Sequence, residues 1–160
     1  MSSIIIVGHK NPDTDTVVAS LVWGDYLKRK GYWPKVCRAG QLNYETKFVL
    51  KYFHQNQPPL IKNLAKKKVF LIDHNEASQA VDGLDKAQLV GILDHHKLGG
   101  LKTAEPIFCR IEALGSSSTL VAKIFLENNY KLNKKQAGLL LAGIISDTLN
   151  FHSPTTTLED

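Results

Sequence analysis

The stretch "IIIVGHKNPDTDT", residues 4–16, carries the strongest fold signal in this chain. A short run of β-branched residues closed by Gly8 is typical of a buried strand. One imidazole and two carboxylates, those of His9, Asp13 and Asp15, come directly after this strand. The pattern raises the question of why acidic and imidazole side chains gather where a buried strand ends.

The rest of the chain alternates between strand-like and helix-like segments. Asn43 and Asn133 are placed as helix caps, and Gly31 follows the first helical pattern as a stop signal. Alternation of this kind favours an α/β fold with three layers, in which a mainly parallel sheet has helices on both faces. Further strands are expected at residues 33–39, 67–76, 87–97 and 105–113, and helices at residues 14–31, 43–55, 115–129 and 133–151.

The composition is that of an ordinary globular domain. The chain has 160 residues, 43% of them hydrophobic and 22% charged, which is enough for one domain with its own core. It has no apolar run of the length that a membrane span needs and no signal-peptide pattern at its N-terminus, so we expect a cytoplasmic protein without a membrane partner. Cys37 and Cys109 are far apart and are expected to be buried thiols rather than a disulfide.

The formal net charge is +5, and much of it lies in short runs at residues 27–30, 66–68 and 133–135. Aromatic residues are not interleaved with these runs, as a stacking surface for nucleic acid would require. We therefore interpret the runs as solvated surfaces and expect no nucleic-acid partner, although a mild attraction for anionic substrates stays open.

Three strand-like runs end in the same chemistry. "VFLIDHNE", residues 69–76, and "LVGILDHH", residues 89–96, also carry acid and imidazole at the end of an apolar strand, as residues 4–16 do. Ligands of open parallel sheets bind outside the carboxyl ends of the strands, so these side chains are expected to meet at one edge. The predicted cluster contains His9, Asp13, Asp15, Asp73, His74, Asp94, His95 and His96, with Asp147 added from late in the last helix.

Carboxylates that gather in one place need cations, because like charges raise one another's pKa. A mixed set of imidazole and carboxylate ligands suits Mn²⁺, Fe²⁺, Co²⁺ or Zn²⁺ better than Ca²⁺, and about six ligands suit two ions that share a bridging carboxylate. Taken alone, "NPDTD" could be only a turn, and residues 116–119 could be a helix cap or a helix N-terminus that faces phosphate. His54 and His152 stand alone and are not expected to be ligands.

The segments "GHKNPDTD", "DHNE", "DHH" and "SDTLNFHSPT", in this order, resemble the DHH phosphoesterase superfamily. Within it they are most similar to the family II, manganese-dependent inorganic pyrophosphatases, over residues 4 to about 157. The resemblance implies two Mn²⁺ ions per chain, with Co²⁺ as a substitute, and diphosphate as the substrate. It implies that His9 and Asp13 bind one ion, that Asp15, His95 and Asp147 bind the other, that Asp73 bridges the two, that His96 faces the substrate phosphate, and that His74 and Asp94 orient the ligands.

One departure from the family pattern concerns domain organisation. Family II enzymes have a second domain whose Lys and Arg residues, around an SRKKQ-like motif, hold the substrate, and residues 1–160 contain nothing like it. We expect a DHH metal-binding domain that lacks its C-terminal partner domain in cis and has very low activity alone. A homodimer stays open. The alternatives are a phosphodiesterase or exopolyphosphatase, or a non-catalytic module for metal binding or dimerisation.

Overall fold

The computed structural model describes residues 3–160 and contains one five-stranded sheet whose recorded pairings are all parallel. The strand order is β2-β1-β3-β4-β5. The strands are β1 (Ile4–Val7), β2 (Pro34–Cys37), β3 (Lys68–Ile72), β4 (Gln88–Asp94) and β5 (Phe108–Ile111). The helices are α1 (Thr14–Arg29), α2 (Tyr44–Tyr52), α3 (Ser117–Glu127) and α4 (Lys134–Asp147), with a short 3₁₀ turn, η1 (Leu84–Lys86). The α/β class is confirmed, and each predicted strand and helix is present.

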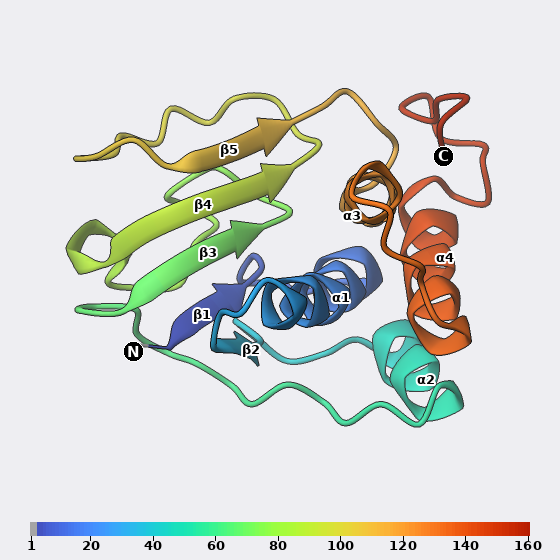
Figure 1. Cartoon of the computed structure of the whole chain (residues 1–160), viewed down its shortest axis with the longest axis horizontal. Coiled ribbons are helices and arrows are strands. Elements are labelled where there is room, and N and C mark those ends of the chain that lie inside the picture. The colour runs from blue at the N-terminus through green and yellow to red at the C-terminus, as the bar shows by residue number, and fades with distance from the viewer. Residues whose placement is uncertain (1–2) are drawn as a thin grey trace.

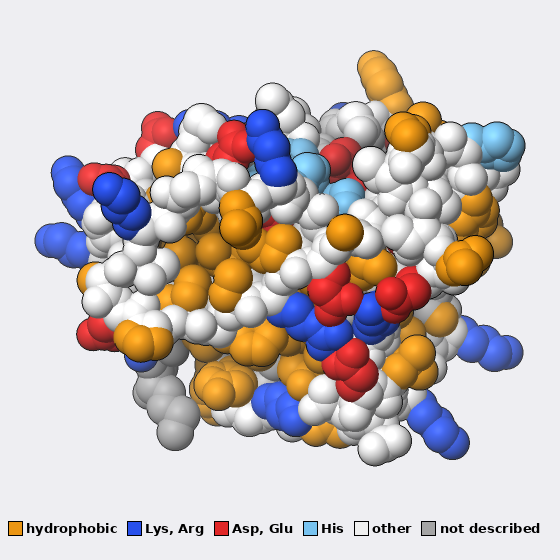
Figure 2. Space-filling view, turned by 90° about the horizontal axis from the view of Figure 1, so that it is seen from above, with side chains coloured by type: hydrophobic (Ala, Val, Ile, Leu, Met, Phe, Trp, Pro, Cys, Tyr) orange, Lys and Arg blue, Asp and Glu red, His pale blue; other side chains and the backbone are white. Residues whose placement is uncertain are grey.

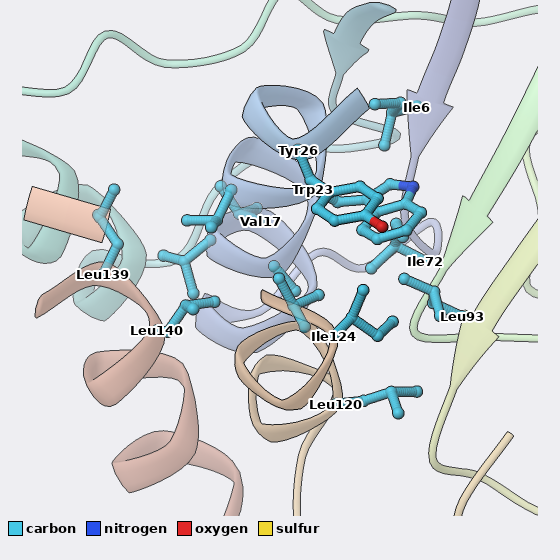
Figure 3. Packing of buried hydrophobic residues seen from close by; sticks show 14 of the residues in the cluster. Ile6, Val17, Trp23, Tyr26, Ile72, Leu93, Leu120, Ile124, Leu139 and Leu140 are labelled. Atoms are coloured by element: carbon cyan, nitrogen blue, oxygen red, sulfur yellow. The ribbon is translucent and has the colours of Figure 1, made fainter. Parts of the chain in front are cut away.

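The four α-helices lie together on one side of the sheet (Figure 1). Their apolar faces and alternate strand residues form the larger hydrophobic core, in which Ile6, Ile72 and Leu93 meet the helices (Figure 3). Trp23 stacks on Tyr26 within α1, with ring centroids 4.6 Å apart. Helix α1 is central to this layer because it packs against both α3 and α4.

The opposite face of the sheet is covered differently from the expectation of helices on both sides. Its smaller core is built from the other strand residues, such as Val7 and Leu71, and from side chains of η1 and the loops, such as Val81 and Leu84. The connections from β3 to β4 and from β4 to β5 move across the sheet in the direction opposite to that from β1 to β2. Right-handed crossovers therefore place them on the second face, and these connections contain no α-helix.

Most helix ends follow the predicted signals. Asn43 and Asn133 cap α2 and α4 as expected, and Gly31 has a φ of +83° just after α1. The last helix was expected to reach residue 151 but ends at Asp147. The Thr148 hydroxyl accepts the Phe151 amide, and residues 149–151 all have positive φ, so the chain turns out of the helix. Cys37 is buried, whereas Cys109 lies exposed on the edge strand β5, which corrects the expectation of two buried thiols.

Within residues 3–160, none of the helices combines the length and apolar character that crossing a membrane requires.

Candidate metal centre

The clustered acids and imidazoles lie at the carboxyl ends of β1, β3 and β4. The strand order reverses between β1 and β3, which is the switch point where open α/β sheets bind ligands. His9 follows β1, Asp73 follows β3, and α1 begins beside them and adds Asp13 and Asp15. Figure 2 shows pale-blue histidine side chains beside a red acidic side chain on the face seen from above. All the predicted site residues are thus found at this one edge, with Asp147 contributed by the end of α4.

Asp73 occupies the centre of the cluster. Its Oδ2 atom lies 3.4 Å from Nε2 of His9, and its Oδ1 atom lies 3.3 Å from Nε2 of His95. The residue has a φ of +65°, and its backbone amide donates to the Leu93 carbonyl at 2.8 Å, next to the β4 strand. A left-handed backbone at a non-glycine residue is uncommon and is held here by the neighbouring strand. The two carboxylate oxygens therefore face two different sets of side chains.

The first set is His9, Asp13 and Asp73. Nε2 of His9 lies 3.3 Å from Oδ2 of Asp13. The other oxygen of Asp13 accepts the Thr16 amide at 2.9 Å and so caps α1. One carboxylate thus fixes the start of the helix and offers a ligand atom, which explains why the turn signal and the ligand signal coincide in "NPDTD".

The second set is Asp15, Asp73, His95 and Asp147. Nε2 of His95 lies 3.2 Å from Oδ2 of Asp147, and no atom of the described residues gives it a hydrogen bond. Nδ1 of His95 donates to the Leu114 carbonyl at 3.0 Å. Because the Leu114 carbonyl holds the proton of Nδ1, loss of the second ring proton would leave on Nε2 the lone pair that a metal ion requires.

Two serines that the sequence analysis did not place in the site hold Asp15 and Asp73. The backbone amides of Ser117 and Ser118 donate to the two oxygens of Asp15 at 2.7 and 2.9 Å, and the Ser117 hydroxyl donates to Asp73 at 2.8 Å. The α3 N-terminus is thus capped by Ser116, as expected, and faces a buried carboxylate rather than an open phosphate site. The only sequence signal was the cap motif, which does not reveal the partner.

Asp94 organises the third strand end. It is fully buried, accepts the backbone amides of His95 and His96, and lies 2.8 Å from Nδ1 of His96. His96 is half-exposed at the rim. Nδ1 of the buried His74 donates to the Ile72 carbonyl at 3.0 Å, and this hydrogen bond spans the left-handed residue Asp73. Nε2 of His74 has no hydrogen-bond partner among the described residues. Asn75, which the sequence analysis did not place in the site, donates a hydrogen bond to Asp94.

The electrostatics of the cluster favour bound cations. Burial raises the pKa of Asp15 well above its usual value, and the charges of Asp73 and Asp147 add to this effect. Burial also raises the pKa of Asp147. Burial lowers the pKa of His9 and His95, but the adjacent carboxylates outweigh it and raise these values to about 10 and about 11. The negative charge of the carboxylates is therefore balanced by the protonated rings of His9 and His95. A bound metal ion would take over this role, and the rings would release their protons.

The donor set fits transition-metal ions. Each group offers ligand atoms that lie within 4.8 Å of one another, and the groups share Asp73. The orphaned Nε2 of His95 and the mixture of nitrogen and oxygen donors suit Mn²⁺ or a similar ion better than Ca²⁺. Cys37 and Cys109 do not belong to any of these groups. The carboxylate of Asp73 is therefore a candidate ligand in each of these groups.

The remaining candidates lie away from this edge. His54 and His152 are exposed and belong to none of these groups. Lys66–Lys68 line an open cavity of about 1270 Å³ at the amino end of β3, opposite the cluster. Lys134 and Lys135 begin α4, whereas Asp147 ends it. Neither of these two lysine runs is placed to contact a molecule bound at the carboxyl edge.

The fold and the cluster define an α/β domain with histidine and aspartate ligands at the ends of its central strands. Residues 3–144 match the model of the DHH family, N-terminal domain, and the chain belongs to that family. Over its full length it is 41% identical to the manganese-dependent inorganic pyrophosphatase of Bacillus subtilis. A solved structure from Methanococcus jannaschii, assigned to the family II inorganic pyrophosphatases, superposes with a TM-score of 0.91 at 40% identity over 98% of this chain.

Two limits of these similarities matter for function. An exopolyphosphatase-related protein from Bacteroides fragilis shares the fold, with a TM-score of 0.73, but its sequence identity to this chain is only 18%. The chain covers 52% of the Bacillus subtilis protein and 52% of the Methanococcus jannaschii chain, so it spans about half the length of the relatives it matches.

Proposed function

We propose that this chain is the metal-binding half of a manganese-dependent inorganic pyrophosphatase, which hydrolyses diphosphate to two phosphates. The observation that carries the proposal is Asp73, whose two oxygens face His9 on one side and His95 on the other. The names of the relatives support manganese and diphosphate, and the donor set suits Mn²⁺. Co²⁺, with the same preference for nitrogen and oxygen ligands, is expected to substitute.

In this proposal the protein side chains divide into three roles. His9 and Asp13 bind one ion and Asp15, His95 and Asp147 bind the other, while Asp73 bridges them. When bound, two such ions lower the pKa of a shared water and neutralise phosphate oxygens. Asp94 and His74 orient their neighbours through the hydrogen bonds described above. The Ser117 and Ser118 amides of α3 keep Asp15 in place.

His96 is the residue proposed to meet the substrate. Its hydrogen bond to Asp94 raises the pKa of the ring, so the imidazole carries positive charge more readily than a free histidine. It is half-exposed at the rim, where an incoming anion arrives. A positive donor at this position would neutralise a phosphate oxygen as charge develops in the transition state. Asp73 and His96 are therefore the two residues to which we assign direct catalytic roles.

The second half of the relatives' length has a proposed role as well. Phosphoryl transfer needs positive charge around the non-bridging oxygens. Because the two lysine runs considered above lie away from the cluster, we propose that a further domain in cis supplies these cations. A homodimer and a cytoplasmic location stay predictions.

The test is phosphate release from diphosphate with Mn²⁺, measured on this chain and on a chain extended through the region that matches the second half of the relatives. The extended chain is expected to turn over, and residues 1–160 alone are expected to be slower by several orders of magnitude, because one transition-state donor is already worth about 10²–10³ in rate. Equal rates would show that the cations come from within this chain.

Polyphosphate and short oligonucleotides serve as competing substrates in the same assay. Faster turnover of either one by the extended chain would replace the proposed substrate. An extended chain that binds Mn²⁺ but hydrolyses none of these substrates would instead identify a non-catalytic metal-binding module.

A further inference from the structure

We infer that Asp160 is a positioning residue for only one of the two proposed metal ions, the ion held by Asp15, His95 and Asp147. This inference rests on the proposed metal centre and concerns a residue outside the cluster. The connection runs through residues 114–118, here called the support segment. Asp160 lies beyond the residues that match the family model.

The support segment contacts one side of the cluster. Its Leu114 carbonyl orients His95, and its Ser117 and Ser118 amides hold Asp15. The Ser117 hydroxyl reaches Oδ1 of Asp73, the oxygen that faces His95 rather than His9. The hydrogen bonds recorded for the segment include none to His9 or Asp13. Movement of the segment would therefore disturb one set of ligands directly and reach the other only through the shared Asp73.

Asp160 fixes the first part of this segment. The Gly115 amide donates to both carboxylate oxygens, at 3.0 and 2.9 Å, directly after the Leu114 carbonyl that orients His95. The Thr119 hydroxyl, one residue past the segment, donates to Asp160 at 2.6 Å. The Thr157 amide and hydroxyl both donate to it at 2.8 Å. One carboxylate thus ties the support segment, the first turn of α3 and the 157–160 turn together.

Close packing gives this contact little freedom. A Cβ atom added at Gly115 would lie 2.7 Å from Oδ2 of Asp160 and 2.7 Å from a methyl carbon of Thr148. Glycine at position 115 therefore lets the Asp160 carboxylate approach the backbone, because glycine has no Cβ atom. Without Asp160, the Gly115 amide loses its partner, and the Leu114 carbonyl is free to rotate away from His95. Loss of a direct hydrogen-bond partner of a metal ligand, the role that the Leu114 carbonyl has for His95, costs about 10–100-fold in metal affinity.

In the experiment, Mn²⁺ is titrated into the protein and the free ion is followed by electron paramagnetic resonance. The titration gives the number of bound ions and the affinity of each. It compares the unchanged chain with Asp160→Ala and Asp160→Asn, the second of which keeps the shape of the side chain. We expect one ion to bind about 10-fold or more weakly in Asp160→Ala and the other to bind within about twofold of the unchanged chain. Glu159→Gln is the matched control, because it breaks the ion pair with Lys123 without touching Gly115.

A second readout needs no metal. In chelator, the ¹⁵N and ¹H signals of the His95 ring should shift in Asp160→Asn, while those of His9 stay in place. Equal weakening of both ions, no weakening, or the same result from Glu159→Gln would overturn the inference. Because neither readout measures hydrolysis, a failed diphosphate assay leaves the inference standing, and a failed titration leaves the choice of substrate standing.

Discussion

Two groups of candidate ligands that share Asp73, His9 with Asp13 and Asp15 with His95 and Asp147, are built in different ways. His9 and Asp13 come from one short loop, and the Asp13 side chain is 39% exposed. Asp15, His95 and Asp147 come from α1, the end of β4 and the end of α4, and Asp15 is completely buried. The first group is a local structure supported by a helix cap, and the second is a tertiary structure supported by the α3 amides.

This difference teaches how the site is coupled to the fold. Helices α1, α3 and α4 pack against one another, and the second group forms only when they do. An ion in that group therefore binds the native state far better than the unfolded chain and should stabilise the whole helical layer. An ion between His9 and Asp13 depends mainly on one loop and the end of β3. The predictions below separate the two groups.

The largest effect is expected from Asp73→Asn, because it weakens both groups at once. A ligand present at 100 times its dissociation constant stabilises a protein by about 2.7 kcal/mol for each site. The unchanged chain should therefore melt at a clearly higher temperature in Mn²⁺ than in chelator, and Asp73→Asn should lose most of this difference. Thermal melts followed by circular dichroism measure it.

His54→Ala is the control for this measurement, since His54 is exposed and belongs to none of the groups. It should keep the full stabilisation by Mn²⁺. If Asp73→Asn also kept it, the central position of Asp73 in the metal centre would be contradicted.

A smaller and more selective effect is expected from the pair Asp13→Asn and Asp147→Asn. Each variant should retain one bound ion, because each removes a carboxylate from one group only. Asn caps helices as well as Asp does, so any loss of stability of Asp13→Asn in chelator should be limited to the lost pairing of Asp13 with His9. Burial and the charge of Asp73 raise the pKa of Asp147, so Asp147→Asn should melt no lower than the unchanged chain in chelator.

Titration of Mn²⁺ and melts in chelator test the pair together. A drop to no bound ions in either variant would show that the two groups do not act separately. A marked loss of stability of Asp147→Asn in chelator would show that its carboxylate is satisfied without a metal ion.

The part of the site that the sequence predicted is the part carried by side-chain chemistry. Asp73, Asp94 and His95 each follow an apolar strand, and parallel strands bring such ends together whatever the details of packing. Asp147 was added because it follows an apolar helical run, and its role as a ligand came only from the family resemblance. The strands and helices themselves were predictable for the same reason, since hydrophobic periodicity and caps are local signals.

The supporting contacts could not be predicted, because most of them are made by the backbone. Every residue has a backbone carbonyl, and every residue but proline has a backbone N–H, so only the packing of α3 selects the Leu114 carbonyl and the Ser117 amide. The end of α4 was predicted wrongly for a similar reason. The left-handed turn at residues 149–151 depends on the Thr148 hydroxyl, whereas the helical pattern in the sequence continues to residue 151. The face of the sheet on which each connection lies depends on the strand order, because crossovers are right-handed. The sequence does not reveal the strand order, so the loops on the second face could not be predicted.

The smallest expected effect concerns acid, and it isolates the contact between Asp160 and the support segment. Hydrogen bonds from Thr119, Thr157 and Gly115 outweigh the opposing effect of burial and hold the pKa of Asp160 below its usual value. A carboxyl group with a lowered folded pKa contributes stability above its unfolded pKa of about 3.9, and that contribution is lost as the pH falls through the lower folded value. Asp160→Asn cannot titrate, and its stability deficit should be below about 1 kcal/mol at pH 6 because the group is partly solvated. Urea unfolding in chelator from pH 6 to pH 3 should show the deficit shrinking as the pH falls below about 4. A deficit that stays constant over this range would mean that the charge on Asp160 is not what holds Gly115 in place.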